Sequence, residues 1–440
     1  MGNTKETYLS MKPETAKRFK YWQTRTIIAT MVGYAMFYFV RKNLSMAMPG
    51  MQEDLGITKA DLGLFLTLNG LVYGASRFIN GMAGDRFNAR YFMVIGLVMC
   101  AICNIIFGFS SALLVFGIVW LFNGWFQGMG FPPCVRLLTH WVPPHQLATK
   151  MSIWNTSHSI GAGLAVIICG YVASLGWRWC FFIPSMIALL GAVFLWFTLR
   201  DTPSSVGLPE ITSQKEDDEA QEGASSGKKE IDRSSAEYKQ FVRKKVFLNP
   251  YIWVLAIANF FVYVVRAAVL DWGPTLLGEW KGVELHHAGW MVAAFEICGI
   301  LGMLIAGWAT DKYFKGRGMR VCVFCMMGAA LFLFLFWKLS FLSATASTVL
   351  LMAAGFFIYG PQALIGITAA NLATNKAAAT AAGFTGLFGY ASAIVSGWVL
   401  GLLADNYGWH YAFLSLIGAG VIGVFVFLLG WRAKAHGYDD

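Results

Sequence analysis

Two arginines lie within long apolar stretches of the sequence, where a charged side chain is costly. Arg41 ends the run "IIATMVGYAMFYFVR" and is followed by Lys42, and Arg266 lies in "FFVYVVRAAVLDWGP". A charge at the centre of a bilayer costs about 2.5–3.5 kcal/mol on insertion scales, so such residues usually mark a substrate pathway. A guanidinium group remains charged at physiological pH, and its planar fork binds phosphate or carboxylate through two hydrogen bonds. The two arginines therefore predict a site for an anion.

The spacing around both arginines places tyrosines on the same helical face. Tyr38 precedes Arg41 by three residues, and Tyr263 precedes Arg266 by three, which puts each pair on one side of a helix. A single carboxylate would leave one arginine uncompensated, whereas a phosphate dianion could satisfy both. We therefore expect inorganic phosphate or a phosphate ester. The alternative, a cation that snorkels to the membrane surface, fits Lys42 better than the two arginines.

The composition predicts a membrane protein. The chain is 57% hydrophobic and only 13% charged, and apolar runs of about 20 residues follow one another along it. Helices are expected because hydrocarbon offers no partner for an unpaired backbone group. The predicted fold is all-α, with twelve transmembrane helices in two six-helix bundles. The predicted spans are residues 26–48, 61–83, 91–109, 113–136, 147–174, 179–199, 251–274, 286–309, 319–338, 346–372, 378–404 and 410–431.

The two halves of the chain resemble each other. "YFVR" and "YVVR" recur at an offset of 225 residues, "GDRFNAR" and "TDKYFKGRGMR" at 226, and "LGWRW" and "YGWHY" at 232. Such repeats predict two bundles that rock about a site near the bilayer midplane. The expected segments are a cytoplasmic N-terminal segment (1–25), an N-terminal bundle (26–200), a polar cytoplasmic linker (201–249), a C-terminal bundle (250–432) and a cytoplasmic tail (433–440).

The formal charge of +10 could suggest nucleic acid, but its distribution favours a membrane orientation instead. Lys and Arg gather before the first span and in loops that lie on one side if the spans alternate. This positive-inside bias predicts that both termini are cytoplasmic and that nucleic acid is not a partner. No cleavable signal peptide is expected, because the first apolar run contains Arg41 and Lys42 and lacks a convincing cleavage site.

Further polar residues interrupt the apolar spans. Arg77, Asn155 and His158 are candidates for the same cavity, with Asn155 and His158 three residues apart on one helical face. His158 could donate to a phosphate and couple transport to protons, or it could be a neutral histidine bonded to a neighbouring helix. Asp271 and Glu296 could pair with the cations instead of leaving them to a ligand.

Motifs for other chemistry are not supported by their context. The pairs Cys100/Cys103 and Cys322/Cys325 have metal-like spacing, but neither a histidine nor a second pair completes a zinc module. "GAGVIG" fits the dinucleotide pattern, yet it lies inside an apolar span with no preceding strand. There is no Walker lysine motif and no HExxH. We expect neither an enzyme nor a bound cofactor or metal.

The motifs around these residues resemble a known family. The repeat and its loops are similar to the major facilitator superfamily. Within it, "YFVRKN", "NGWFQGMGFPPC", "WNTSHSIGAG", "VYVVRAAVLDWGP", "YGPQALIG" and "AAGFTGLFGY" resemble the organophosphate:phosphate antiporters. The resemblance covers essentially all of the chain outside the linker. It implies exchange of a phosphate ester for inorganic phosphate by rocking of the two bundles.

The resemblance also implies roles for individual residues. Arg41 and Arg266 match the phosphate-binding pair, and His158 matches a cavity histidine. Arg77 stands where relatives are expected to have lysine, a change that keeps the charge but alters the geometry. A gating loop motif is matched by Asp85, Arg86 and Asp311.

The ester and the type of activity stay open between several hypotheses. "NARYFMVIGL", "LNPYIW" and "AAFEICGILG" favour the hexose-phosphate branch, which includes transporters and a sugar-phosphate receptor, so we lean to glucose-6-phosphate. Glycerol-3-phosphate exchange, a sensor that signals to a membrane kinase, and proton-coupled import through His158 are the alternatives. The resemblance implies a monomer in the inner membrane. The sugar end would be read by Tyr38, Asn155, Tyr263 and Tyr359.

Overall fold

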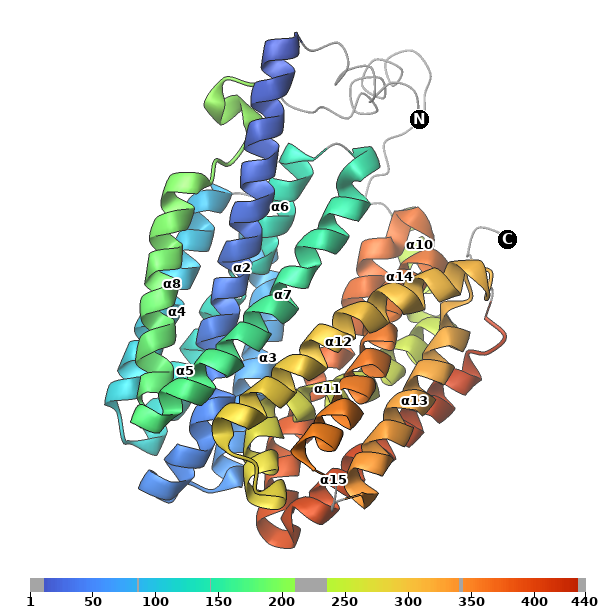
Figure 1. Ribbon diagram of the computed structural model, residues 1–440. Helices are drawn as coiled ribbons and strands as arrows, with labels where there is room; N and C mark the ends of the chain where they lie inside the picture. Colours follow the sequence, from blue (N-terminus) through green and yellow to red (C-terminus); the bar gives the residue numbers. More distant parts are fainter. Residues whose placement is uncertain (1–11, 85–86, 143, 210–235, 340–342, 434–440) are drawn as a thin grey trace.

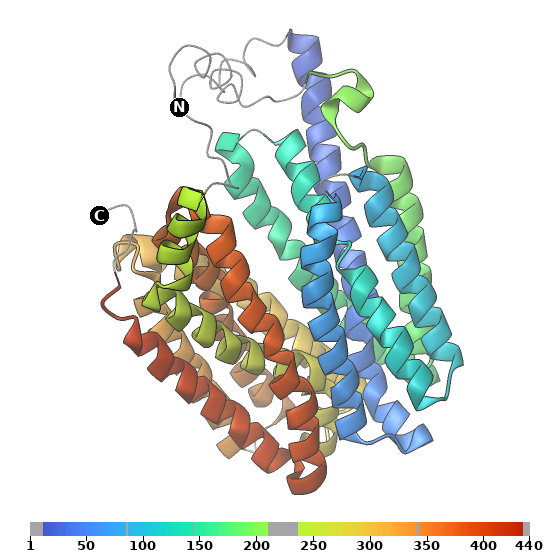
Figure 2. The ribbon, with the colours of Figure 1, turned by 180° about the vertical axis from the view of Figure 1, so that it is seen from behind.

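The computed structural model describes residues 12–84, 87–142, 144–209, 236–339 and 343–433. These residues fold into helices that form two bundles lying side by side (Figures 1 and 2). The N-terminal half holds α2 (Pro13–Leu55), α3 (Lys59–Gly84), α4 (Ala89–Phe109), α5 (Leu113–Gln127), α6 (Phe131–Trp141), α7 (Pro144–Val172) and α8 (Trp179–Thr198). The C-terminal half holds α11 (Pro250–Lys281), α12 (Leu285–Lys312), α13 (Gly318–Lys338), α14 (Ala344–Ala391), the π-helix η4 (Ile394–Val399) and α15 (Leu400–Leu429).

The number of spans agrees with the prediction. Among the described residues, nine helices are long and apolar enough to cross a membrane, and one of them, Thr380–Leu429, covers two predicted spans. Helices α2 and α3 have the required length but fall outside these nine; they carry the half-buried cations Arg41, Lys42 and Arg77. Together they account for twelve spans, so the predicted all-α architecture is confirmed.

Helix boundaries differ from the predictions in three places. Helix α2 begins at Pro13, inside the segment expected to precede the first span. The predicted linker contains three short helices: the 3₁₀-helix η2 (Pro203–Val206), the α-helix α10 (Ala236–Val242) and the π-helix η3 (Arg243–Phe247). Helix α14 runs through the predicted loop between spans 346–372 and 378–404, where the sequence "KAAATAA" has high helix propensity.

Equivalent turns in the two halves are built on glycines with positive φ. Gly56 ends α2 at φ 64° and ψ 23°, and Gly282 ends α11 at φ 65° and ψ 24°. Gly176 (φ 113°) and Gly408 (φ 78°) form the second pair. Residues with a Cβ rarely adopt this conformation, so glycine is required at each turn. We call the side of the molecule with these four turns the turn face.

A carboxylate fixes each pair of turns in the same way. The indole nitrogen of Trp177 donates to Asp54 at 2.9 Å in the N-terminal half, and that of Trp409 donates to Glu279 at 2.7 Å in the C-terminal half. Each tryptophan directly follows the glycine of its own turn. The internal repeat of the sequence is therefore matched by repeated local structure.

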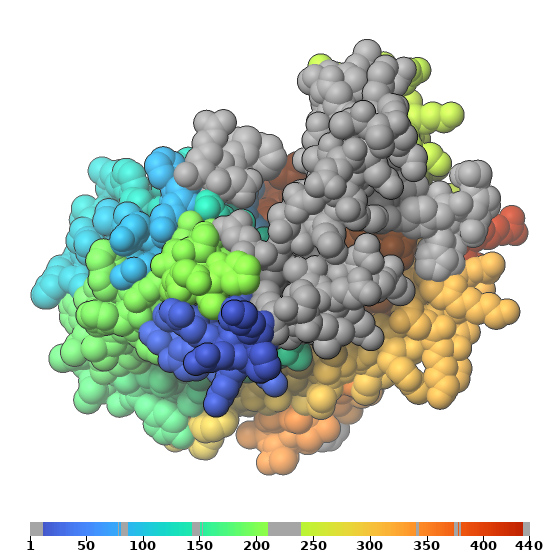
Figure 3. Space-filling model, turned by 90° about the horizontal axis from the view of Figure 1, so that it is seen from above, coloured from blue at the N-terminus to red at the C-terminus, as the bar shows by residue number. Residues whose placement is uncertain are grey.

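The two halves contact each other towards the turn face. Helix α3 lies against η4 and α15, where the backbones of Gly63 and Gly397 approach so closely that a Cβ on either would clash. Lys59 lies between two acids of the other half, 3.0 Å from Glu279 and 3.8 Å from Asp405. We call this region, together with the contact between α7 and α12, the turn-face seam. Viewed from above, the blue-to-green residues lie mainly on one side of the molecule and the yellow-to-red residues on the other (Figure 3).

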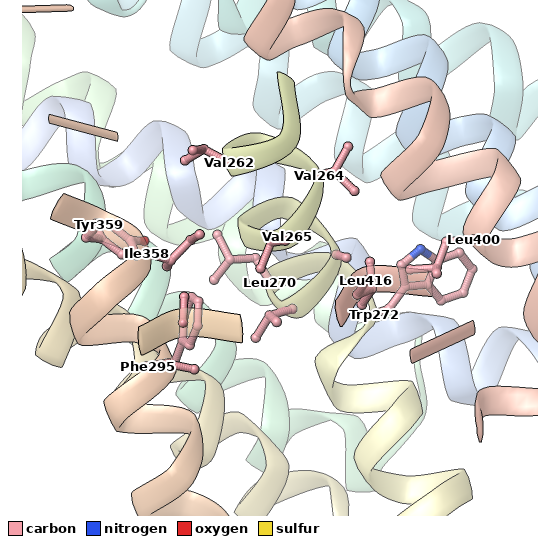
Figure 4. Close-up of a cluster of buried hydrophobic side chains, with 14 of the residues drawn as sticks. Val262, Val264, Val265, Leu270, Trp272, Phe295, Ile358, Tyr359, Leu400 and Leu416 are labelled. Carbon is pink, nitrogen blue, oxygen red and sulfur yellow. The ribbon is translucent and has the colours of Figure 1, made fainter. Parts of the chain in front are cut away.

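Helix α11 is the central element of the C-terminal core. Figure 4 shows Phe295, Ile358 and Tyr359 on one side of it, and Leu400 and Leu416 beside Trp272 on the other. All of these side chains are buried. Burial on both sides fixes the rotation of α11 about its axis, and with it the direction in which Arg266 points.

Close packing of α12 on α14 depends on Gly302. A Cβ at this position would meet the backbone of Phe356, which cannot move independently of its helix. We expect Gly302→Ala to lower the free energy of unfolding by about 1–3 kcal/mol through overpacking. A Cβ added at Gly307, on the same helix, would have no heavy atom within 4 Å, so Gly307→Ala is the matched control. Thermal unfolding in detergent compares the two; equal unfolding temperatures would contradict the packing argument.

Candidate functional site

A cavity of about 90 Å³ lies between the two halves, above the turn-face seam. Helices α2 and α3 contribute one wall, and α11 with residues 389–397 contributes the other. Its walls combine four ionic side chains with aromatic and small residues. They are Tyr38, Arg41, Lys42, Leu66, Asn69, Gly70, Trp120, Tyr263, Arg266, Ala267, Leu270, Asp271, Gly389, Tyr390, Ser392, Ala393, Ser396 and Gly397. The two arginines singled out from the sequence thus line one cavity.

Arg41 lines the cavity, and its guanidinium group lies over aromatic rings. Its guanidinium carbon lies 3.9 Å from the ring centre of Tyr73 and 5.5 Å from that of Tyr38. Within the part of the chain that the structure describes, no carboxylate lies within ion-pair distance of it. Tyrosine faces stabilise a cation but do not neutralise it. Arg41 therefore keeps its charge available for an anion.

Arg266 is held by an acid and a tyrosine of its own half. Its terminal nitrogen lies 3.3 Å from Glu296, whose side chain is fully buried, and its guanidinium carbon lies 4.7 Å from the ring centre of Tyr359. Two buried polar atoms here, Nε of Arg266 and Oε2 of Glu296, have no hydrogen-bond partner among the described residues. Unpartnered buried polar atoms are rare, so their clustering indicates a place where a polar ligand completes the hydrogen bonds.

Lys42 and Asp271 form an ion pair between the halves. The two charged atoms are 2.5 Å apart, and the side chains are 13% and 17% exposed. Lys42 therefore lies in the cavity and does not extend to the membrane surface, the alternative that the sequence allowed for it. Because the pair joins α2 to α11, it also connects the two bundles at the level of the arginines.

Arg77 lies between this cavity and a second hollow. Its guanidinium group donates to the hydroxyl of Tyr390 in the other half, and its carbon lies 3.7 Å from the ring centre of Phe131. The second hollow, of about 670 Å³, is lined by Arg77, Phe131, Pro132, Val135, Arg136, Thr139 and His140. Arg77 therefore lines the second hollow and contacts Tyr390, which lines the smaller cavity.

The charges around the cavity do not balance. Arg41, Lys42, Arg77 and Arg266 contribute four positive charges, and Asp271 and Glu296 contribute two negative ones, which leaves a formal charge of +2. Burying uncompensated charge is unfavourable. A dianion such as hydrogen phosphate or a phosphate monoester at neutral pH has the charge that would neutralise the site.

The structure places the other sequence candidates at varying distances from the cavity. Tyr263 lines it. His158 is buried, bonds to the hydroxyl of Ser159 at 2.9 Å, and has its ring centre 5.9 Å from that of Tyr38. Asn155 is half-buried on α7, and neither it nor His158 lines the cavity.

The structure describes only one of the three predicted gating residues. Asp85 and Arg86 lie outside the described residues. Asp311 is exposed near the end of α12, and none of the ion pairs among the described residues involves it. The gating role of these three residues stays a prediction.

Sequence reasoning missed two groups of residues at this site. Tyr73 and Tyr390, the partners of Arg41 and Arg77, read as ordinary aromatic residues of apolar spans. Three buried amides, Asn104, Asn123 and Gln127, bond to the backbone of α2 next to Arg41. The signal that could have found the amides is their polarity in the otherwise apolar runs "CAICNIIFGF" and "FNGWFQ".

One cluster of described side chains has geometry suited to a metal. The ligand atoms of Glu284, His286 and His287 lie within 4.8 Å of one another at the start of α12. Glu284 and His287 are largely exposed, and none of the three lines the cavity.

The chain is similar to known proteins over most of its length. A family model described as Major Facilitator Superfamily matches residues 30–397, with a second match at 276–437. A probable hexose phosphate transport protein of Chlamydia pneumoniae is 41% identical over 423 residues, covering 95% of this chain and 93% of that protein. The membrane sensor protein UhpC of Escherichia coli (strain K12) is 39% identical over 417 residues, covering 93% and 92%.

A solved structure supports the fold. The crystal structure of a bacterial homolog to the human lysosomal transporter Spinster, in an inward-facing and unoccupied conformation, superposes with a TM-score of 0.79. It covers 95% of this chain and 99% of that chain, at 14% sequence identity. At that identity the likeness concerns the arrangement of the helices.

Proposed function

Because the chain belongs to the major facilitator superfamily and, within it, to the organophosphate:phosphate antiporter family, we propose that it exchanges a sugar phosphate for inorganic phosphate across the membrane. It is a multi-pass membrane protein of a transporter family and not an enzyme. The observation that carries the proposal is the formal charge of +2 around a cavity lined by one arginine from each half, with no acid of the described residues in ion-pair distance of Arg41.

The proposed mechanism follows from this charge. In the empty cavity the cations repel one another, and moving them into a narrower, drier space is unfavourable. A bound dianion neutralises them and bonds to both Arg41 and Arg266, so it draws the halves together and permits reorientation. Because the empty cavity reorients poorly, one anion leaves only as another is carried back. Exchange then needs no ATP.

The side of the membrane towards which the cavity opens can be inferred from the polar contacts between the halves. The polar contacts between the halves run from Lys59 at the turn face to Arg77, and none is found among the described residues beyond Arg77 towards the end of α3. This state of the protein is thus closed towards the turn face. If the termini are cytoplasmic and the protein lies in the inner membrane, the cavity is accessible from the cytoplasm.

Opening of the turn face should require separation of Asp405 from α3. Its carboxylate accepts from the backbone nitrogens of Lys59 and Ala60, and so caps α3 from the other half. We expect Asp405→Ala to increase the population open at the turn face. The measurement is the distance distribution between spin labels at Glu53 and Asn406, both exposed, by pulsed electron paramagnetic resonance.

The matched control for that variant is Asp61→Ala. Asp61 bonds to Thr58 at 2.7 Å within its own half, so its removal changes the same charge without touching the seam. A longer distance between the two spin labels in Asp405→Ala, but not in Asp61→Ala, supports the role of Asp405 in holding the turn face closed. Unchanged distances in both variants would show that Asp405 does not hold the seam closed.

The exchange proposal is tested by uptake of labelled glucose-6-phosphate into proteoliposomes with and without trapped phosphate. We expect uptake only with phosphate inside, and unlabelled glycerol-3-phosphate as competitor identifies the preferred ester. Uptake driven by a pH gradient with no internal phosphate would favour proton-coupled import.

A sensor is the second candidate, because a relative of similar identity is named as a membrane sensor protein. Binding of glucose-6-phosphate without uptake under any of these conditions would favour it over exchange. In that case the same cavity would serve as a receptor, with a membrane kinase as the expected partner.

A further inference from the structure

Helix α2 is interrupted immediately before Arg41. Val40 has φ −95° and ψ 18°, outside the helical range, although the helix continues on both sides. This part of conformational space is sparsely populated and often found near functional sites. The break changes the direction of α2 at the residue before the guanidinium group, so it affects where Arg41 points.

Three side-chain amides converge on the carbonyl oxygen of Val40. The Nδ2 atoms of Asn104 on α4 and Asn123 on α5 both lie 3.0 Å from it, and Nε2 of Gln127 on α5 lies 3.4 Å from it. Gln127 also donates to the carbonyl of Phe37 at 3.0 Å. The oxygen of Val40 thus has partners outside its own helix.

These amides are fully enclosed, and the asparagines among them are bonded to one another. Asn104, Asn123 and Gln127 are at most 2% exposed. Asn43, one turn beyond the break, donates to the side-chain oxygen of Asn104 at 2.8 Å, and Asn104 donates to that of Asn123 at 3.3 Å. We call these four residues the amide cluster. Buried amides are costly without partners, so their positions and the break stabilise each other.

The described part of the C-terminal half shows no such arrangement around Arg266. Helix α11 has no non-helical residue at Val265, and the amide hydrogen bonds found in this half, from Asn259 to Thr385 and from Asn406 to Leu402, do not reach the backbone next to Arg266. There Arg266 is oriented by Glu296 and Tyr359 instead. Each arginine therefore has its own support: an acid for Arg266, and a fixed backbone break for Arg41, which has no acid.

We propose that the amide cluster is a positioning device that holds the break at Val40 and thereby directs Arg41 at the phosphate. It rests on the proposed function, since it assigns the cluster a part in binding the exchanged anion. Without an acidic partner, the Arg41 side chain depends on its backbone for direction. A backbone fixed before binding spares the ligand the cost of ordering this arginine.

The test compares phosphate binding to purified variants by competition with labelled phosphate. Asn123→Leu removes a donor to Val40 and is expected to weaken phosphate binding at least tenfold. The control is Asn80→Leu, a buried asparagine of the same half that donates to Ser76 at 2.7 Å and to the carbonyl oxygen of Trp125 at 3.5 Å but not to α2. This variant should bind phosphate within twofold of wild type. Gln127→Ala removes the longest of the three bonds to Val40, together with the bond to Phe37. It should have a smaller effect on phosphate binding, and it guards against misfolding of Asn123→Leu.

A further comparison separates positioning from general loss of structure. In an Arg41→Lys background, Asn123→Leu should weaken phosphate binding no further, because both changes act through the same group. Wild-type affinity in both Asn123→Leu and Gln127→Ala, or an equal loss in Asn80→Leu, would overturn the proposal. If wild-type protein itself binds no phosphate, it is the proposed function that fails.

Discussion

Arg266→Lys should weaken phosphate binding by roughly 100-fold while the protein still inserts and folds. Lysine keeps the charge, but it replaces the planar fork with a point charge that cannot donate in parallel to two phosphate oxygens. A hydrogen bond to a charged group contributes about 1.5–3 kcal/mol, so loss of one such bond corresponds to a reduction of that order. The same result is expected for Arg41→Lys, whose guanidinium group faces the cavity with no competing acid.

The measurement is isothermal titration with inorganic phosphate in detergent, with thermal unfolding to confirm that each variant is folded. Arg432→Lys serves as the control, since Arg432 is exposed at the end of α15 and far along the chain from the cavity residues. Wild-type affinity in both cavity variants would remove the arginines from the phosphate site.

The second large effect is expected at the ion pair between Lys42 and Asp271. Asp271→Asn raises the formal charge of the cavity from +2 to +3, so a dianion no longer neutralises it, and leaves Lys42 without its partner at 2.5 Å. Removing one member of a buried pair costs about 3–5 kcal/mol, whereas removing both is often close to neutral. We expect Asp271→Asn to slow exchange at least tenfold without weakening phosphate binding.

The double variant Lys42→Met/Asp271→Leu distinguishes charge balance from a specific role of either residue. It restores the charge of +2, and exchange should recover most of its rate in proteoliposomes. Exchange in the double variant as slow as in Asp271→Asn would contradict the charge-balance account.

Much of the site could be predicted from residue type and spacing. Arginine is so unfavourable in hydrocarbon that Arg41 and Arg266 could be selected from the sequence alone, and the internal repeat indicated that they face each other. Asp271 and Glu296 were expected as possible partners of the cations, and the structure pairs them with Lys42 and Arg266. A charged residue within an apolar span has few explanations other than a partner or a ligand, so its role can be predicted from the sequence.

Other features of the site depend on geometry that a sequence does not contain. The role of Asn123 depends on a backbone break one helix away, and the acceptor is a main-chain oxygen that every residue has. Tyr73 and Tyr390 differ from core aromatics only through the arginines that they meet. The role of His158 stays a prediction: its ring centre lies 5.9 Å from that of Tyr38, which lines the cavity, while His158 is not itself a lining residue.

The central claim is that a phosphate dianion must occupy the cavity for the two halves to reorient. It is tested most directly by loading proteoliposomes with labelled inorganic phosphate and measuring its release after glucose-6-phosphate is added outside. The account predicts negligible release into buffer without a phosphate ester and rapid release when the ester is present. In Arg41→Lys, release should be negligible under both conditions. Rapid release into buffer with no anion outside would contradict it, because the empty, positively charged cavity would then reorient freely.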